Sequence, residues 1–117
     1  MVDDNRDSAE SIATLLQLSG HQTMTVHDGI EAVEATERFR PEVVLLDVGL
    51  PKISGIEACR RIRHLPSGRN VIIVALTGWG QDSDRRKTRE AGFDAHLVKP
   101  VDYSELLQLL AALMPSP

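Results

Sequence analysis

Several side chains that could take part in phosphoryl chemistry follow segments expected to be strands. They are Asp3, Asp4, Asp47, Thr77 and Lys99. The strands of an open α/β sheet bind ligands beyond their carboxyl ends, which share one rim. We therefore expect three carboxylates, one hydroxyl and one ammonium group to meet at that rim.

The three carboxylates predict a metal site. Carboxylates that lie close together repel each other unless a cation or a proton joins them. No histidine or cysteine stands beside them in the sequence, and ligands that are all oxygen favour a hard cation. Mg²⁺ is the cation we expect, and Mn²⁺ could replace it.

The lysine and the threonine predict that an anion binds beside this metal. An anion such as phosphate can bridge the metal and the ammonium group of Lys99, and the hydroxyl of Thr77 can donate to a phosphoryl oxygen. Asp47 is then placed as the nucleophile of an in-line phosphoryl transfer that forms an aspartyl phosphate.

The segments that position these residues predict an α/β fold. Residues 43–46 and 71–76 are continuous apolar runs, typical of strands that are covered on both faces. Weaker strands are expected at 23–26 and 95–98. Helical patterns lie between the strands, so we expect a parallel sheet with helices on both faces. Only two residues precede Asp3, so we interpret the first strand as truncated.

Five helices are expected. Asp7 and Ser8 are candidate caps of the first helix, in which Ile12, Leu15 and Leu16 cannot all face inward. This helix is expected to stop at Gly20. A second helix is expected from about residue 30 to Pro41, a third over about 56–63, and a polar fourth over about 82–91 that ends at Gly92. The last helix is expected over 104–114, with a buried stripe of Leu106, Leu107, Leu110 and Leu113.

Short motifs resemble the receiver domain of two-component response regulators, in order and over nearly the whole chain. They are Val2-Asp3-Asp4-Asn5, Leu46-Asp47-Val48-Gly49-Leu50-Pro51 with Gly55, Ala75-Leu76-Thr77-Gly78 and Val98-Lys99-Pro100. The resemblance implies one receiver domain over residues 1–117. It also implies a three-layer, flavodoxin-like fold whose five-stranded parallel sheet has the order 2-1-3-4-5.

The resemblance further implies the acceptor and the metal ligands. Asp47 would accept a phosphoryl group from the phosphohistidine of a histidine kinase or a histidine phosphotransfer protein. Asp4, Asp47 and the backbone carbonyl of Gly49 would bind Mg²⁺, and Asp3 would order the water shell of the metal.

The resemblance also implies the groups that respond to phosphorylation. Thr77 and Lys99 would hold the phosphoryl oxygens, and the bond between Lys99 and Pro100 would be cis. Many receivers carry Tyr or Phe at the position of His96, and that ring rotates inward when the threonine moves. We hypothesise that His96 acts as the rotating residue here.

Two positions that tune the phosphoryl lifetime in the family are Gly49 and Trp79 in this chain. We predict that Trp79 shields the site from water. Gly78 stands where the family has a small alanine, which predicts a looser loop. The stretch from Leu76 to Asp102 looks especially like receivers that are fused to hybrid sensor histidine kinases.

Three other functions fit parts of the pattern. A degenerate receiver would bind partners without phosphorylation, although all the key side chains are present. An aspartyl-nucleophile phosphatase usually carries a second carboxylate two residues after the nucleophile, where this chain has Gly49. A flavodoxin-like cofactor binder is disfavoured by an aromatic content of 3%. The receiver itself would catalyse only its own phosphorylation and dephosphorylation.

Composition indicates the cellular compartment and the classes of partner that this chain could bind. The net charge of −4 gives no general attraction for nucleic acid, so we interpret the basic runs at 60–63 and 85–89 as solvated helix faces. The single cysteine, Cys59, excludes an internal disulfide and suits a reducing compartment. No apolar run approaches the roughly 18 residues of a membrane span. We expect a cytoplasmic domain that binds a histidine kinase or phosphotransfer protein; the sequence leaves its oligomeric state open.

Overall fold

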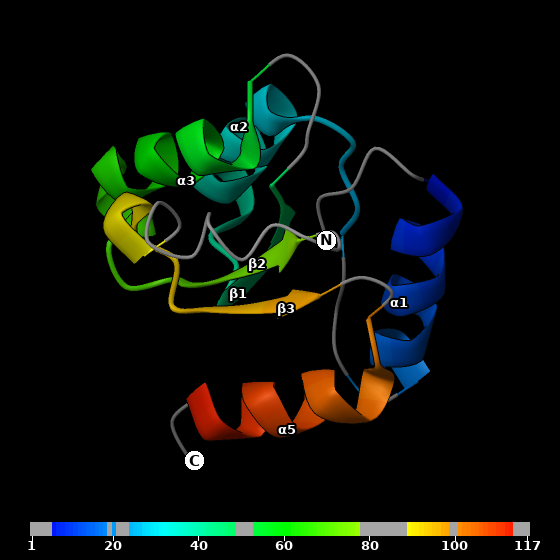
Figure 1. Cartoon of the computed structure of the whole chain (residues 1–117). Helices are drawn as coiled ribbons and strands as arrows, with labels where there is room; N and C mark the ends of the chain where they lie inside the picture. Colours follow the sequence, from blue (N-terminus) through cyan, green and yellow to red (C-terminus); the bar gives the residue numbers. More distant parts are fainter. Residues whose placement is uncertain are drawn as a thin grey trace.

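The computed structural model describes residues 6–18, 20, 24–48, 53–77, 89–98 and 101–113. The helices and strands of these residues alternate along the chain (Figure 1). They are α1 (Arg6–Leu18), α2 (Gly29–Phe39), β1 (Val43–Asp47), α3 (Gly55–His64), the short 3₁₀ helix η1 (Pro66–Gly68), β2 (Ile72–Thr77), β3 (Ala95–Val98) and α5 (Tyr103–Leu113).

The three described strands form a parallel sheet of order β1-β2-β3. This is the order predicted for the third, fourth and fifth strands of the chain. Of the strand predicted at 23–26, residues 24–26 are described. Only Val26 of these forms a β-bridge, and Met24 is exposed, so this part is shorter than expected. The predicted first strand lies outside the described residues.

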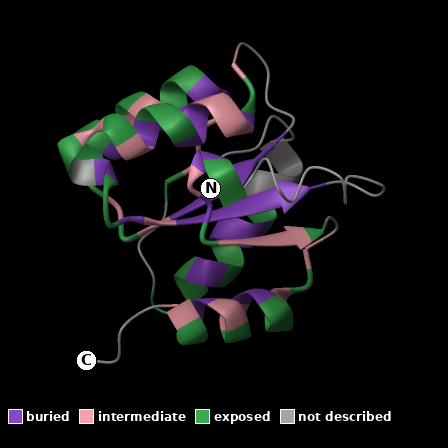
Figure 2. Cartoon of the chain, turned by 60° about the vertical axis from the view of Figure 1, so that its left-hand side comes forward, coloured by how far each residue is buried: buried purple, intermediate pink, exposed green. Residues whose placement is uncertain are grey.

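Helices cover the sheet on both faces, as predicted from the continuous apolar runs. In Figure 1, α2 and α3 lie on one side of the strands, and α1 and α5 lie on the other. Side chains alternate along each strand, so that Ile73 and Ala75 pack toward α3 while Val74 and Leu76 pack toward α1 and α5. Figure 2 shows β1 and β2 mostly buried and β3, at the edge of the described sheet, half-buried.

Capping groups fix the starts of three helices. The side chain of Asp28 accepts a hydrogen bond from the backbone N–H of Glu31, and Ser54 does the same for α3. Asp102 accepts from two N–H groups in the first turn of α5, which explains why this helix begins one residue before the predicted start. None of the described helices has both the length and the apolar content of a membrane-spanning helix.

The ends of α1 were predicted with mixed success. Gly20 follows the helix at φ 93° and donates to the carbonyl of Gln17, so the predicted stop is confirmed. The predicted caps are wrong, because the helix begins at Arg6 and includes Asp7 and Ser8. Asp is also favoured in the first turn by the helix dipole, so its presence alone does not separate a cap from a first turn.

One arginine of the basic run at 60–63 does not lie on a solvated face. Arg63 has a side chain that is 19% exposed and lies 2.9 Å from the carboxylate of Asp94. Its guanidinium also donates to the carbonyls of Gly92 and Val71. The solvated-face interpretation is therefore wrong for Arg63, whereas Arg60 and Arg61 are exposed as predicted.

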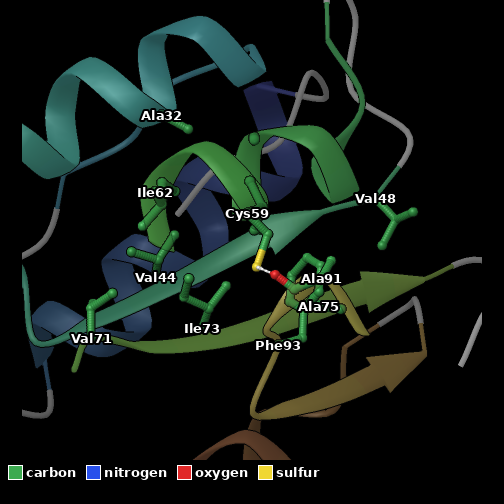
Figure 3. Close-up of a cluster of buried hydrophobic side chains, with 12 residues drawn as sticks. Ala32, Val44, Val48, Cys59, Ile62, Val71, Ile73, Ala75, Ala91 and Phe93 are labelled. Atoms are coloured by element: carbon green, nitrogen blue, oxygen red, sulfur yellow. Dashed lines mark hydrogen bonds between the residues drawn. The ribbon is translucent and has the colours of Figure 1, made fainter. Parts of the chain in front are cut away.

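Cys59 is a core residue, as its helical position predicted. Its side chain is fully buried, and its Sγ lies 3.5 Å from the carbonyl oxygen of Ala91 (Figure 3). Burial raises the pKa of this thiol from 9.0 to about 11. The neutral thiol thus contributes to the cluster between α3 and the sheet.

Candidate functional site

Asp47 and Thr77 are the last residues of adjacent strands. Asp47 ends β1 and lies opposite Leu76, so Thr77, one residue further along β2, stands at the same rim of the sheet. Each residue is 7% exposed. The two apolar runs therefore deliver a carboxylate and a hydroxyl to one edge, as the sequence predicted.

The backbone beside Asp47 is fixed on two sides. The N–H of Val48 donates to the carbonyl of Leu76 at 3.0 Å, and the carbonyl of Val48 accepts from the N–H of Gly55 at 2.9 Å. A Cβ atom on Gly55 would overlap the carbonyl oxygen of Asp47. The N-terminus of α3 thus packs directly against the backbone of Asp47 and Val48.

Thr77 and His96 share a face of the sheet. His96 lies opposite Ala75, and Thr77 lies opposite Val98. Since Ala75 packs in the cluster beneath α3, His96 and Thr77 face that side as well. The Thr77 hydroxyl donates to the carbonyl of Leu97 at 3.4 Å, and His96 is half-buried.

The described residues contain three members of the predicted site, Asp47, Thr77 and His96. The other predicted residues lie outside the described part of the chain: Asp3, Asp4, Gly49, Trp79, Lys99 and Pro100. Among the described residues, Asp47 is the one predicted metal ligand, and no group of three or more carboxylate, histidine or cysteine side chains that could hold a metal is found there. The buried carboxylate of Asp47 is a hard oxygen ligand of the kind that Mg²⁺ prefers.

Sequence reasoning missed a segment that packs against the loop after Asp47. Asp28 is 5% exposed and caps α2, and Gly29 packs against Ile53. The signal that could have found it is the Asp-Gly pair just before the apolar residue Ile30, since Asp is a favoured helix cap. The ion pair of Arg63 was also missed.

A parallel α/β sheet with an acidic residue and a hydroxyl at the ends of adjacent strands places the chain in the class of flavodoxin-like α/β folds, whose ligands bind beyond the carboxyl ends of the strands. Residues 1–111 match the family model of the response regulator receiver domain. The chain therefore belongs to this family, and it is a receiver domain of the kind found in two-component signalling.

Relatives come from response regulators and from a sensor kinase. The response regulator MprA of Mycobacterium leprae (strain TN) is 37% identical over 113 residues, which cover 97% of this chain and 49% of that protein. The chain thus spans about half the length of the curated relatives it matches.

Two solved structures share the fold. One is the receiver domain of the sensor histidine kinase PA1611 from Pseudomonas aeruginosa PAO1, which holds a magnesium ion in its active site cleft. It has a TM-score of 0.87 and 37% identity, and the match covers 96% of this chain and 92% of that one. The chemotaxis response regulator CheY4 of Vibrio cholerae has a TM-score of 0.90 and 26% identity, with 97% and 94% covered.

Proposed function

We propose that Asp47 accepts a phosphoryl group from the phosphohistidine of a histidine kinase or a histidine phosphotransfer protein. A carboxylate oxygen of Asp47 attacks phosphorus, the P–N bond breaks, and the imidazole nitrogen keeps the electron pair. The observation that carries this proposal is the buried carboxylate of Asp47 at the end of β1, beside Thr77 at the end of β2.

The remaining groups of the site would position and neutralise the phosphoryl group. Asp4, Asp47 and the carbonyl of Gly49 would bind Mg²⁺, with Asp3 ordering its water shell, and the metal would supply positive charge to the phosphoryl oxygens. Mn²⁺ could substitute for it. The proposal is supported by the Mg²⁺ in the active site cleft of the PA1611 receiver, to which this chain is similar.

Thr77 and Lys99 would bind the phosphoryl oxygens. Val98 ends β3 and lies opposite Thr77. Lys99 is the next residue in the sequence and lies outside the described residues; we propose that its ammonium group reaches the same rim. The hydroxyl of Thr77 would turn toward the new phosphoryl group, and His96 on the same face would respond. We also propose that the bond between Lys99 and Pro100 is cis.

The partner that delivers the phosphoryl group would dock along α1. Ile12 and Leu16 are buried against the sheet, whereas Leu15 is 39% exposed and Leu18 is 80% exposed. Two exposed leucines on the solvent side of α1 offer an apolar contact for a helical partner. We place this receiver, over residues 1–117, in the cytoplasm, where ATP-dependent kinases phosphorylate their histidines.

The test is phosphorylation by a small donor. The protein is incubated with acetyl phosphate and Mg²⁺, and its intact mass is followed beside an Asp47→Asn variant and a Glu34→Gln variant, which changes an exposed carboxylate of α2. We expect one added phosphoryl group in the wild type and in Glu34→Gln, dependent on the metal, and none in Asp47→Asn. A folded wild type that gains nothing would instead be a degenerate receiver, which binds partners without phosphorylation.

A further inference from the structure

The first residue of α2 lies against the segment that returns from the acceptor loop. A Cβ atom on Gly29 would lie 2.5 Å from the Cγ1 of Ile53 and 2.7 Å from its carbonyl oxygen. Both distances are far shorter than the roughly 3.5–4.0 Å of an ordinary carbon contact. Only glycine lets the two segments approach this closely.

The start of α2 is held in place by core packing, because Ala32 is 1% exposed and lies in one buried cluster with Ala58 and Cys59 of α3. Asp28 is buried, its carboxylate accepts from the N–H of Glu31 at 2.9 Å, and its carbonyl accepts from the N–H of Ala32 at 3.0 Å. Gly29 itself is buried. The backbone of Gly29 is therefore held in place beside Ile53.

The loop that Ile53 belongs to begins and ends at the acceptor strand. Val48 follows Asp47 directly, and its carbonyl accepts from Gly55, two residues after Ile53. The hydrogen bond between Gly55 and Val48 thus closes the loop at the residue that follows β1. Ile53 is the described residue of this loop that packs against α2.

We infer that Gly29 is a positioning residue for the acceptor loop and that it sets the affinity of the site for Mg²⁺. The inference rests on the proposed function, in which Asp47 and the carbonyl of Gly49 bind the metal at the start of this loop. A side chain at position 29 would push Ile53 and its backbone outward, and the displacement would reach Val48 through Gly55, whose N–H donates to the Val48 carbonyl.

Helix propensity alone predicts the opposite effect of an alanine. Alanine is favoured over glycine in helices by roughly 1 kcal/mol. If Gly29 served only as the first residue of α2, Gly29→Ala would stabilise the protein and leave the metal site unchanged. Weaker Mg²⁺ binding by Gly29→Ala would therefore show that the contact with Ile53, and not helix propensity, determines the role of Gly29.

The experiment measures Mg²⁺ binding in the unphosphorylated protein, from the amide NMR shifts of Val48 and Leu76 during titration. We expect Gly29→Ala to bind Mg²⁺ about tenfold more weakly, the effect typical of displacing a group that supports a metal ligand. Gly20→Ala is the matched control, because its Cβ would have nothing within 4 Å and its φ of +93° makes any effect one of stability. Its Mg²⁺ affinity should equal that of the wild type.

A second variant tests the contact itself. Ile53→Ala removes the Cγ1 and Cδ1 atoms that meet position 29, and we expect it to weaken Mg²⁺ binding because the loop loses its support. In the double variant the loss should be smaller than the sum of the two single losses, since the new methyl group occupies vacated space.

Each outcome decides one question. An unchanged Mg²⁺ affinity in folded Gly29→Ala would overturn the positioning role, and additive losses would show that the two residues act separately. If Gly29→Ala does not fold, Ile53→Ala decides, and an unchanged affinity there overturns the inference. A wild type that does not bind Mg²⁺ would refute the metal site of the proposed function, and the inference with it.

Discussion

Thr77 and His96 lie on one face of the sheet, on adjacent strands and two residues apart in register. His96 is paired with Ala75 and Thr77 with Val98, so the two side chains are diagonal neighbours. Both face the side of the sheet that α3 covers. A movement of the Thr77 hydroxyl toward a phosphoryl group would therefore change the surroundings of the His96 ring directly.

The first prediction is that His96 responds to occupation of the acceptor site. With beryllofluoride as the phosphoryl mimic, we expect the imidazole resonances of His96 to shift, because its ring turns toward the space that Thr77 leaves. His64 is the internal control, since it is exposed at the end of α3 and its Nδ1 lies 2.7 Å from the carbonyl of Arg60. Unchanged His96 resonances in a protein that has bound the mimic would refute the switch.

The second prediction concerns the ion pair of Arg63. The guanidinium donates to Asp94, and also to the carbonyls of Val71 and Gly92 at 2.6 and 2.7 Å. Arg63→Met leaves these partly buried acceptors without their donors. We expect it to lower the free energy of unfolding by about 2–3 kcal/mol, measured by urea denaturation.

The matched control for this prediction is Arg61→Met on the same helix. Arg61 is half-exposed and meets Glu57 at 3.4 Å, an exposed pair. Such a pair contributes about 0.2–1 kcal/mol, so the control should change stability by less than half as much as Arg63→Met. Equal losses in the two variants would mean that the contacts of Arg63 are not structural.

Much of the fold was predictable because its signals are local. The continuous apolar runs identified β1 and β2 to within one residue, since a strand covered on both faces needs no polar alternation. Helix ends were predicted where a glycine follows, as at Gly20. The start of α1 was not, because Asp is favoured both as a cap and in the first turn. The role of Arg63 was not, because its partners Gly92 and Asp94 lie 29 and 31 positions further along the chain.

The site was predictable for a different reason. In a parallel sheet every strand ends at a common rim, so a residue that follows an apolar run is placed by topology alone. This was enough to bring Asp47 and Thr77 together. The approach of Gly29 to Ile53 could not be predicted in this way, because it depends on how α2 packs against a loop 24 positions further along the chain.

The third prediction concerns the lifetime of the phosphoryl group. Trp79 follows Thr77 by two positions and lies outside the described residues. We expect its indole to restrict the access of water to the aspartyl phosphate. Trp79→Ala should therefore lose its phosphoryl group several-fold faster than the wild type, as measured by intact mass over time. A slower or equal rate would contradict the shielding role.

The fourth prediction is a dependence of stability on alkaline pH that arises from Cys59. Burial raises the pKa of its thiol from 9.0 to about 11, while the Arg63 charge acts in the opposite direction. Between these two values the folded protein keeps the thiol proton and the unfolded chain loses it. The contribution of the thiol to stability is therefore complete below pH 9 and is lost as the pH rises through about 11.

This loss can be measured against a variant that lacks the thiol. Two pH units correspond to about 2–3 kcal/mol, so the free energy of unfolding of the wild type should fall by that much more than that of Cys59→Ala. Urea denaturation of both proteins at several values across this window gives the difference in slope. Other groups that titrate between pH 9 and about 11 contribute equally to both proteins, so their effect drops out of the difference. If the unfolding free energies of the wild type and Cys59→Ala fall in parallel with pH, the thiol is not shielded from water.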